Sequence, residues 1–164
     1  MLLVSQIAIY PGSFDPITLG HLSVLSRATG LFSKTYLVVV HNPRKQPMFS
    51  VSDRIELARS SVIERGITGS VEVVGLETGL LVDFARELGA KAILKGFRTA
   101  NDVEYELPMA QVNRDLSGIE TVFLASEPGY GFVSSSLVKE VSSLGGDVSH
   151  YVSKSVATAL EARR

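Results

Sequence analysis

Short apolar runs alternate with segments of helical periodicity along the chain. The apolar runs are rich in β-branched residues and occupy positions 4–10, 34–40, 70–74, 91–95 and 120–124. They lack a clean alternation of polar and apolar positions, which indicates strands that are covered on both faces. Apolar residues recur at helical spacing in the segments between and after them, at positions 50–66, 80–89, 134–146 and 153–164.

Strands that alternate with helices predict an α/β fold with a doubly wound (Rossmann-like) five-stranded parallel sheet and helices on both faces. Ser50 and Asp53 resemble a capping box, and Gly66 and Gly89 are expected to end the helices that precede them. No internal repeat, linker or low-complexity segment divides the sequence, so we expect residues 1–164 to form a single domain.

Composition narrows the class of protein without defining its chemistry. Hydrophobic residues make up 45% of the 164 residues and the net charge is −1, which favours a globular chain and argues against a general nucleic-acid or membrane surface. No apolar run reaches the roughly 18 residues of a membrane span, and the first residues read as a strand rather than a signal peptide. Cysteine is absent, so we expect a cytoplasmic protein without thiol chemistry.

Unusual polar loops follow four of the predicted strands, where doubly wound sheets bind ligands. The first loop, "PGSFDPITLGH", places Ser13 and His21 around a predicted helix start, where free amides and the helix dipole favour phosphate. A lone histidine is more often an ordinary surface residue. The complete set of residues in this loop instead favours an anion-binding site that includes the histidine.

The second and third loops supply cations. Arg44 and Lys45 lie between two prolines, and alone they would be read as a solvated basic turn. Lys95 ends an apolar run and Arg98 follows it. Either these two side chains face a phosphate, or they pair with nearby acidic residues. Composition alone favours neither alternative.

The fourth loop ends in "SSSLVKEV", in which Ser134, Ser135 and Ser136 precede a predicted helix. N-capping needs one serine, so the other two mildly favour a second phosphate site. The sequence has no Ser-His-Asp set, no metal-binding histidine spacing and no P-loop motif. These loops suit phosphoryl or nucleotidyl transfer without a covalent intermediate, because an acceptor that is already a phosphate needs no general base.

Four motifs in order, "YPGSFDPITLGH", "NPRKQPMF", "KGFRTANDVEYE" and "FVSSSLVKEV", closely resemble those of bacterial phosphopantetheine adenylyltransferases. This family belongs to the nucleotidyltransferases with an HxGH-type signature, here "TLGH", and the resemblance covers nearly the whole chain. It implies transfer of AMP from ATP to 4′-phosphopantetheine by in-line attack, which gives dephospho-coenzyme A and pyrophosphate in coenzyme A synthesis. It also implies Mg²⁺ and a homohexamer, although the sequence shows no dedicated carboxylate cage for the metal.

The resemblance assigns roles residue by residue. His21 is expected to stabilise the transition state, with Lys45 and Arg98 as further catalytic residues. The residues expected to bind ATP are Ser13, Phe14, His21, Gly96, Phe97, Arg98, Glu106, Tyr130, Gly131, Phe132, Val133, Ser134, Ser135 and Ser136. Those expected to bind the pantetheine substrate are Ser13, Lys45, Leu81 and Lys95. No residue is expected to be a dedicated metal ligand, and nucleic acid and membranes are not expected partners.

Three positions depart from the family pattern. Ser13 and Lys95 replace the usual threonine and arginine; the serine keeps its hydroxyl, while Lys95 keeps its charge and loses the bidentate fork. Pro108 interrupts a family helix, which should therefore begin near the proline or kink there. This segment is apolar on two sides, which predicts burial on both and contact with the pantetheine arm or a neighbouring subunit.

Two other functions stay open at this point. One is a nucleotidyltransferase that moves AMP or CMP to a different phosphate, such as nicotinate mononucleotide. The other is a nucleotide-binding sensor without catalysis, which would need the phosphate-holding loops but not His21.

Overall fold

Strand and helix alternate through most of the structure, a computed structural model that describes residues 6–67 and 70–164. The elements in chain order are β1 (Ile7–Gly12), α1 (Leu19–Ala28), β2 (Lys34–Val40), α2 (Val51–Glu64), β3 (Val71–Leu76), α3 (Leu81–Glu87), β4 (Ala92–Phe97), α4 (Ala100–Ser117), β5 (Glu120–Ala125), the 3-10 turn η1 (Pro128–Tyr130), α5 (Ser135–Ser143) and α6 (Lys154–Glu161). All five predicted strands are present, and β1, β3 and β4 each end two residues later than predicted. Positions 4 and 5 of the first predicted strand lie outside the described residues.

The five strands form one parallel sheet in the order β3-β2-β1-β4-β5. The chain winds outward from β1 in one direction through β2 and β3, then returns to lay β4 and β5 on the other side. This order confirms the predicted doubly wound sheet, and it places the switch in winding direction between β1 and β4.

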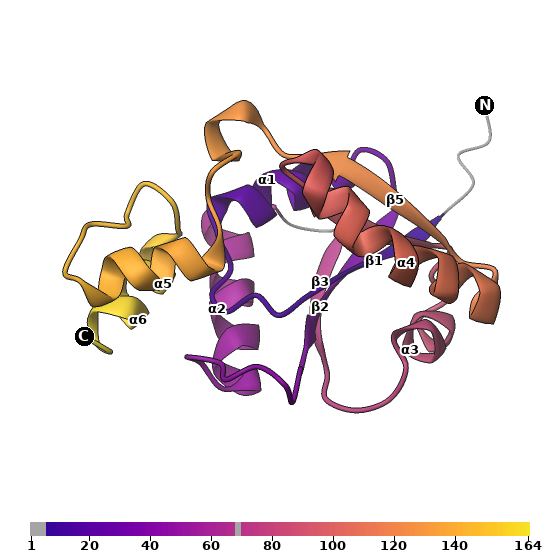
Figure 1. Cartoon of the computed structure of the whole chain (residues 1–164), viewed down its shortest axis with the longest axis horizontal. Helices are drawn as coiled ribbons and strands as arrows, with labels where there is room; N and C mark the ends of the chain where they lie inside the picture. Colours follow the sequence, from indigo (N-terminus) through magenta and orange to yellow (C-terminus); the bar gives the residue numbers. More distant parts are fainter. Residues whose placement is uncertain (1–5, 68–69) are drawn as a thin grey trace.

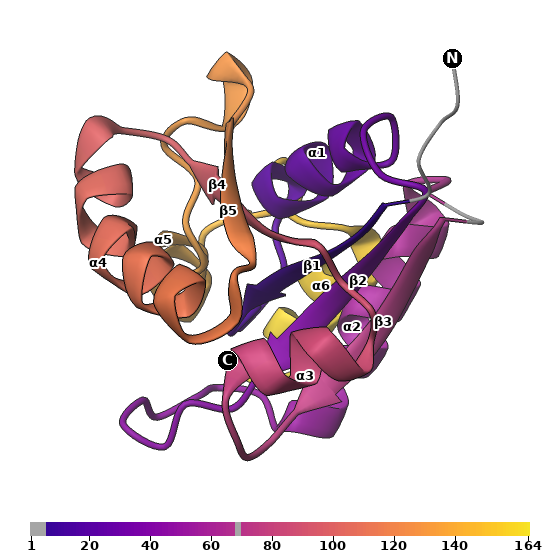
Figure 2. The same ribbon diagram turned by 90° about the vertical axis from the view of Figure 1, so that its right-hand side faces the viewer.

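Helices cover both faces of the sheet, which the two perpendicular views make plain (Figures 1 and 2). One core cluster joins buried side chains of α1, α2, α5 and α6 to strand residues such as Leu37 and Leu94. The other joins α3 to Ile9, Val38 and Ile93. Neighbouring strand residues such as Leu37 and Val38 thus point into opposite cores, which explains why the strands read as continuous apolar runs.

Helix ends follow the local chemistry of the sequence. Ser50, Ser134 and Ser153 each accept a backbone N–H of the first helical turn that follows them. Gly66 and Gly89 have positive φ angles just beyond α2 and α3, as expected of helix-terminating glycines. None of the described helices is both long and apolar enough to cross a membrane.

Helix α4 departs from the expectation for its proline. It begins at Ala100, well before Pro108, and runs to Ser117 with the proline inside it. Of the two predicted alternatives, a helix start near Pro108 is therefore wrong, and a kink at Pro108 stays a prediction. Pro108 and Glu104, the residue whose carbonyl loses its helical partner, are both exposed, so water can reach that carbonyl.

Within the single chain, α4 is not buried on two sides, and the predicted contact with the pantetheine arm or a neighbouring subunit stays a prediction. Among its residues only Asn113 is buried. Five large apolar side chains face solvent: Tyr105, Leu107, Met109, Val112 and Leu116. The helix lies along β4 and β5, at one end of the sheet, so only a narrow stripe of its surface meets the rest of the chain.

Strands β1 and β4 separate near their carboxyl ends. β1 pairs with β2 along its whole length, from Ile7–Lys34 to Gly12–Val39. Its pairing with β4 is confined to Ala8–Ala92 and Ile9–Ile93. Beyond these pairs the two strands diverge at the switch point, which opens the sheet at the edge where the polar loops gather.

Candidate active site

A cavity of about 630 Å³ lies where β1 and β4 part, which is a usual size for a small-molecule site. All four polar loops that were singled out in the sequence contribute to its lining. The expectation that the loops surround one crevice is therefore confirmed.

Phe14 organises the first loop in a strained conformation. Its φ angle of 45° is in the left-handed region, which a bulky residue adopts only at a cost of about 1–3 kcal/mol. The ring is buried, edge-on to both Tyr10 and His21, with ring centroids 5.4 and 5.1 Å away. A Cβ at Gly12 would stand 2.9 Å from the ring, so glycine is needed for this packing. Phe14 thus fixes the plane of His21.

His21 is the third residue of α1 and forms a reciprocal capping box with Thr18. The Thr18 backbone N–H donates to His21 Nδ1 over 3.0 Å, and the His21 backbone N–H donates to Thr18 Oγ1 over 3.4 Å. An atom that accepts from a backbone amide carries no proton. The hydrogen bonds therefore assign the imidazole proton to Nε2.

His21 is neutral at physiological pH. Burial, with a smaller contribution from the charge of Arg98, lowers the pKa of His21 from 6.5 to about 4. The side chain therefore presents an uncharged Nε2–H donor beside the N-terminus of α1, an arrangement that suits a phosphate oxygen.

Lys45 reaches the cavity from the second loop, between β2 and α2. It is exposed and lines the cavity with Asn42 and Gln46, whereas Arg44 is not part of the lining. The Asn42 side chain accepts the backbone N–H of Arg44 over 3.0 Å and shapes the turn before Lys45. Of the two cations predicted to bind an anion, only Lys45 lies at the cavity.

The third loop holds its cations in ion pairs. Lys95 lies 3.1 Å from Glu106, and Arg98 Nε lies 3.4 Å from Asp102. Burial opposes ionisation of Asp102, but hydrogen bonds from the Arg98 and Thr99 amides and from the Arg98 side chain lower its pKa. Both cations thus pair with acidic residues, and Arg98 also lines the cavity.

The three serines of the fourth loop differ in their contacts. Ser134 caps α5, and Ser135 donates its hydroxyl to the Pro16 carbonyl over 2.8 Å, which joins the first and fourth loops. Ser136 is exposed at the cavity without a cap to make.

The cavity brings together most of the predicted site residues: Ser13, Phe14, His21, Lys45, Gly96, Phe97, Arg98, Glu106, Tyr130, Val133, Ser134, Ser135 and Ser136. Outside the lining are Leu81, Lys95, Gly131 and Phe132. Leu81 begins α3 and packs, partly buried, against the core cluster of that helix, and Phe132 packs edge-on against Tyr151. The roles of all the predicted site residues, inside and outside the lining, stay predictions.

Sequence reasoning did not assign four charged residues that line the cavity, namely Asp15, Arg54, Asp102 and Lys139. A signal existed for Arg54, because it lies three residues after Val51 and four before Ala58, on the apolar stripe of α2. A charge at such a position demands buried partners. Asp15 and Lys139 carried no comparable signal.

The comparisons with known proteins agree with this geometry. Residues 9–141 match the cytidylyltransferase-like family model. In fold, the chain resembles a crystal structure from Vibrio parahaemolyticus ascribed to the nicotinate-nucleotide adenylyltransferases, with a TM-score of 0.68 and 20% identity over 95% of this chain and 98% of that one. The chain is thus a nucleotidyltransferase of the cytidylyltransferase-like type.

Curated relatives narrow the class. The chain is 48% identical to the phosphopantetheine adenylyltransferase of Clavibacter michiganensis over 98% of its own length and 99% of the relative's. It is 51% identical to that of Kocuria rhizophila over 94% and 97% of the two lengths. The chain belongs to the phosphopantetheine adenylyltransferase family.

The hydrogen bonds of His21 predict its tautomer and its titration. In long-range ¹H–¹⁵N correlation spectra of the ligand-free protein, with the resonance assigned by loss in His21→Gln, we expect a neutral imidazole protonated at Nε2. It should titrate with a pKa of about 4. A pKa near 6.5, or a proton on Nδ1, would contradict the assignment.

Proposed function

We propose that this chain catalyses the transfer of AMP from ATP to 4′-phosphopantetheine, with dephospho-coenzyme A and pyrophosphate as products. The relatives named phosphopantetheine adenylyltransferase, which match over nearly the full chain, support this substrate pair. The observation that carries the chemistry is the neutral Nε2–H of His21, held at a helix start in a cavity that Lys45 and Arg98 also line.

The proposed reaction is a single in-line displacement. An oxygen of the acceptor phosphate attacks the α-phosphorus of ATP as the bond from that phosphorus to the α,β-bridging oxygen breaks. That oxygen leaves with pyrophosphate as one of its terminal oxygens. The attacking oxygen is already anionic, so no residue has to remove a proton. What the protein supplies is alignment of two phosphates and stabilisation of the charge that develops on them.

We assign a different part of that stabilisation to each of His21, Arg98 and Lys45. His21 donates from Nε2 to an oxygen of the α-phosphate, where negative charge grows in the transition state. Arg98 holds the phosphates of ATP, and Lys45 draws the acceptor phosphate toward the α-phosphorus. Removal of one preorganised donor of this kind typically lowers kcat by about 10²–10³-fold.

The remaining residues are assigned by the family resemblance. Ser13 contacts both substrates, and Leu81 and Lys95 bind the pantetheine substrate. The proposed ATP site comprises Ser13, Phe14, His21, Gly96, Phe97, Arg98, Glu106 and Tyr130–Ser136. Lys95 pairs with Glu106, and its ammonium has further N–H groups that can donate to a bound phosphate.

Mg²⁺ is the proposed cofactor. The described residues contain no cluster of three or more His, Cys, Asp or Glu that could hold a metal. The carboxylates at the cavity are already engaged, Asp15 with Lys139, Asp102 with Arg98 and Glu106 with Lys95. This donor set fits Mg²⁺ that is bound by the phosphates of ATP and by water rather than by a protein cage. The ion would neutralise phosphate charge.

We propose that residues 1–164 form one nucleotidyltransferase domain and assemble as a homohexamer. The exposed apolar side chains of α4 support an interface there, since a surface of this kind is costly to leave in water. The cytoplasmic location stays a prediction.

Sedimentation of the full chain tests the assembly. We expect the wild type to sediment with the mass of a hexamer and Met109→Glu on α4 to dissociate. Ile63→Glu, which charges an even more exposed apolar position on α2, is the matched control and should stay assembled. A monomeric wild type would refute the hexamer, and an intact Met109→Glu hexamer would place the interface elsewhere.

Pyrophosphate release tests the reaction itself. ATP and CTP are each combined with 4′-phosphopantetheine or nicotinate mononucleotide, and we expect release only from ATP with 4′-phosphopantetheine. Release only with nicotinate mononucleotide would contradict the proposed acceptor. ATP binding without release from any pair would favour the sensor.

A further inference from the structure

The loop that carries Lys45 ends in a dipeptide, Met48–Phe49, whose four backbone polar groups are all bound by ionised side chains. The N–H groups of Met48 and Phe49 both donate to the Asp15 carboxylate, over 2.9 Å each. The Phe49 carbonyl accepts from Arg54 Nε over 3.2 Å, and the Met48 carbonyl accepts from Arg163 Nη1 over 3.1 Å. Hydrogen bonds with an ionised partner are stronger than those between neutral groups, so these four bonds hold the dipeptide firmly in place.

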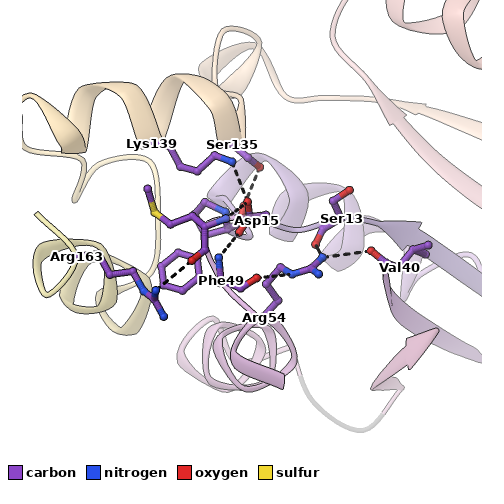
Figure 3. Close-up of polar contacts among 10 residues, drawn as sticks. Ser13, Asp15, Val40, Phe49, Arg54, Ser135, Lys139 and Arg163 are labelled. Carbon is purple, nitrogen blue, oxygen red and sulfur yellow. Dashed lines mark hydrogen bonds and ion pairs between the residues drawn. The ribbon is translucent and has the colours of Figure 1, made fainter. Parts of the chain in front are cut away.

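Asp15 and Arg54 also tie this dipeptide to the rest of the cavity (Figure 3). Arg54, 2% exposed, donates from Nη1 to the carbonyls of Ser13, over 2.6 Å, and Val40, over 3.2 Å. Asp15, 6% exposed, accepts from Lys139 of α5 over 2.8 Å. Burial opposes ionisation of Asp15, but Lys139 and the two amides outweigh it and lower the pKa. The charges are therefore partnered, as buried charges must be.

These contacts grip both ends of the exposed loop. Val40 is the last residue of β2, just before the loop, and Met48–Phe49 closes it before α2 begins. Lys45 lies between these two anchors, three residues before Met48. Arg163 adds an outer brace, because its guanidinium also lies 4.5 Å from the centre of the Phe49 ring and 3.2 Å from Asp53. With both ends fixed, the reach of Lys45 into the cavity is restricted.

We propose that Asp15, Arg54 and Arg163 are positioning residues, which clamp the ends of the Lys45 loop to the first loop and so set the distance from Lys45 to the acceptor phosphate. The acceptor assignment rests on the proposed function. A displacement of about 1 Å in such a group can cost as much as 10²-fold in rate. The clamp acts through Lys45.

Hydrogen exchange measured by mass spectrometry on the ligand-free full chain tests the clamp without turnover. Asp15→Asn and Arg163→Ala should speed exchange in the peptide that spans residues 41–49 by about tenfold or more. Arg164→Ala is the matched control, because this adjacent arginine donates to the Gly146 carbonyl instead and should leave the peptide unchanged. Unchanged exchange in both clamp variants would overturn the proposal.

A kinetic double-mutant cycle tests the action through Lys45. Arg163→Ala, whose side chain is partly exposed and removable without opening the core, should lower kcat/KM for 4′-phosphopantetheine by about tenfold, with KM for ATP little changed. The same substitution in Lys45→Ala should cause no further loss, because the group it positions is gone. Asp15→Asn, where folded, should behave alike and more strongly.

Two kinetic results would overturn the proposal: no loss in kcat/KM from Arg163→Ala, or the same fold-loss with and without Lys45. A wild-type chain that releases no pyrophosphate with any acceptor would refute the proposed function instead. The clamp would then be judged by the exchange experiment, so the two failures are distinguishable.

Discussion

The parting of β1 from β4 beyond the Ile9–Ile93 pair is the constraint on which the site depends. Neighbouring parallel strands normally stay hydrogen-bonded as far as their carboxyl ends. Here the chain reverses its winding direction between these two strands, so no helix crossover binds their ends together. The opening admits loops from β1, β2, β4 and β5 to one cavity, although their residues span positions 10 to 139.

The loops at this opening combine two kinds of rigidity. The first is local: Thr18 and His21 exchange hydrogen bonds across one helical turn, and Phe14 fixes the imidazole from the side. The second is long-range: Asp15 and Arg54 bind backbone groups of the first and second loops. A reaction that the protein promotes only by alignment and charge stabilisation depends on such rigidity. A displaced donor would no longer meet the charge that develops in the transition state.

Sequence alone could predict the parts of the structure that depend on local pattern and topology. The strands read as apolar runs because both sheet faces are covered, and the loops after them converge because carboxyl ends of parallel strands share one edge. The roles of Ser13, Lys45 and His21 came from motif resemblance rather than from physics. Their joint place at the cavity agrees with that resemblance.

Features that depend on contacts distant in sequence could not be predicted. The environment of Arg54 includes the Ser13 carbonyl, 41 residues away in the sequence. The solvent exposure of α4 depends on where it lies along the sheet, which an apolar pattern does not encode. The effect of Pro108 on α4 could not be predicted for a related reason. It depends on whether water can reach the backbone carbonyl that the proline leaves without a hydrogen bond.

The central claim is that this cavity transfers AMP by positioning two phosphates, without a covalent enzyme intermediate. The stereochemical course at the transferred phosphorus tests it most directly. One diastereomer of ATP with sulfur in place of an α-phosphate oxygen is converted with 4′-phosphopantetheine, and the configuration of the thiophosphate product is determined. Inversion is expected from a single in-line displacement. Retention would mean that a side chain such as His21 or a cavity serine first takes the nucleotidyl group, and it would contradict the claim.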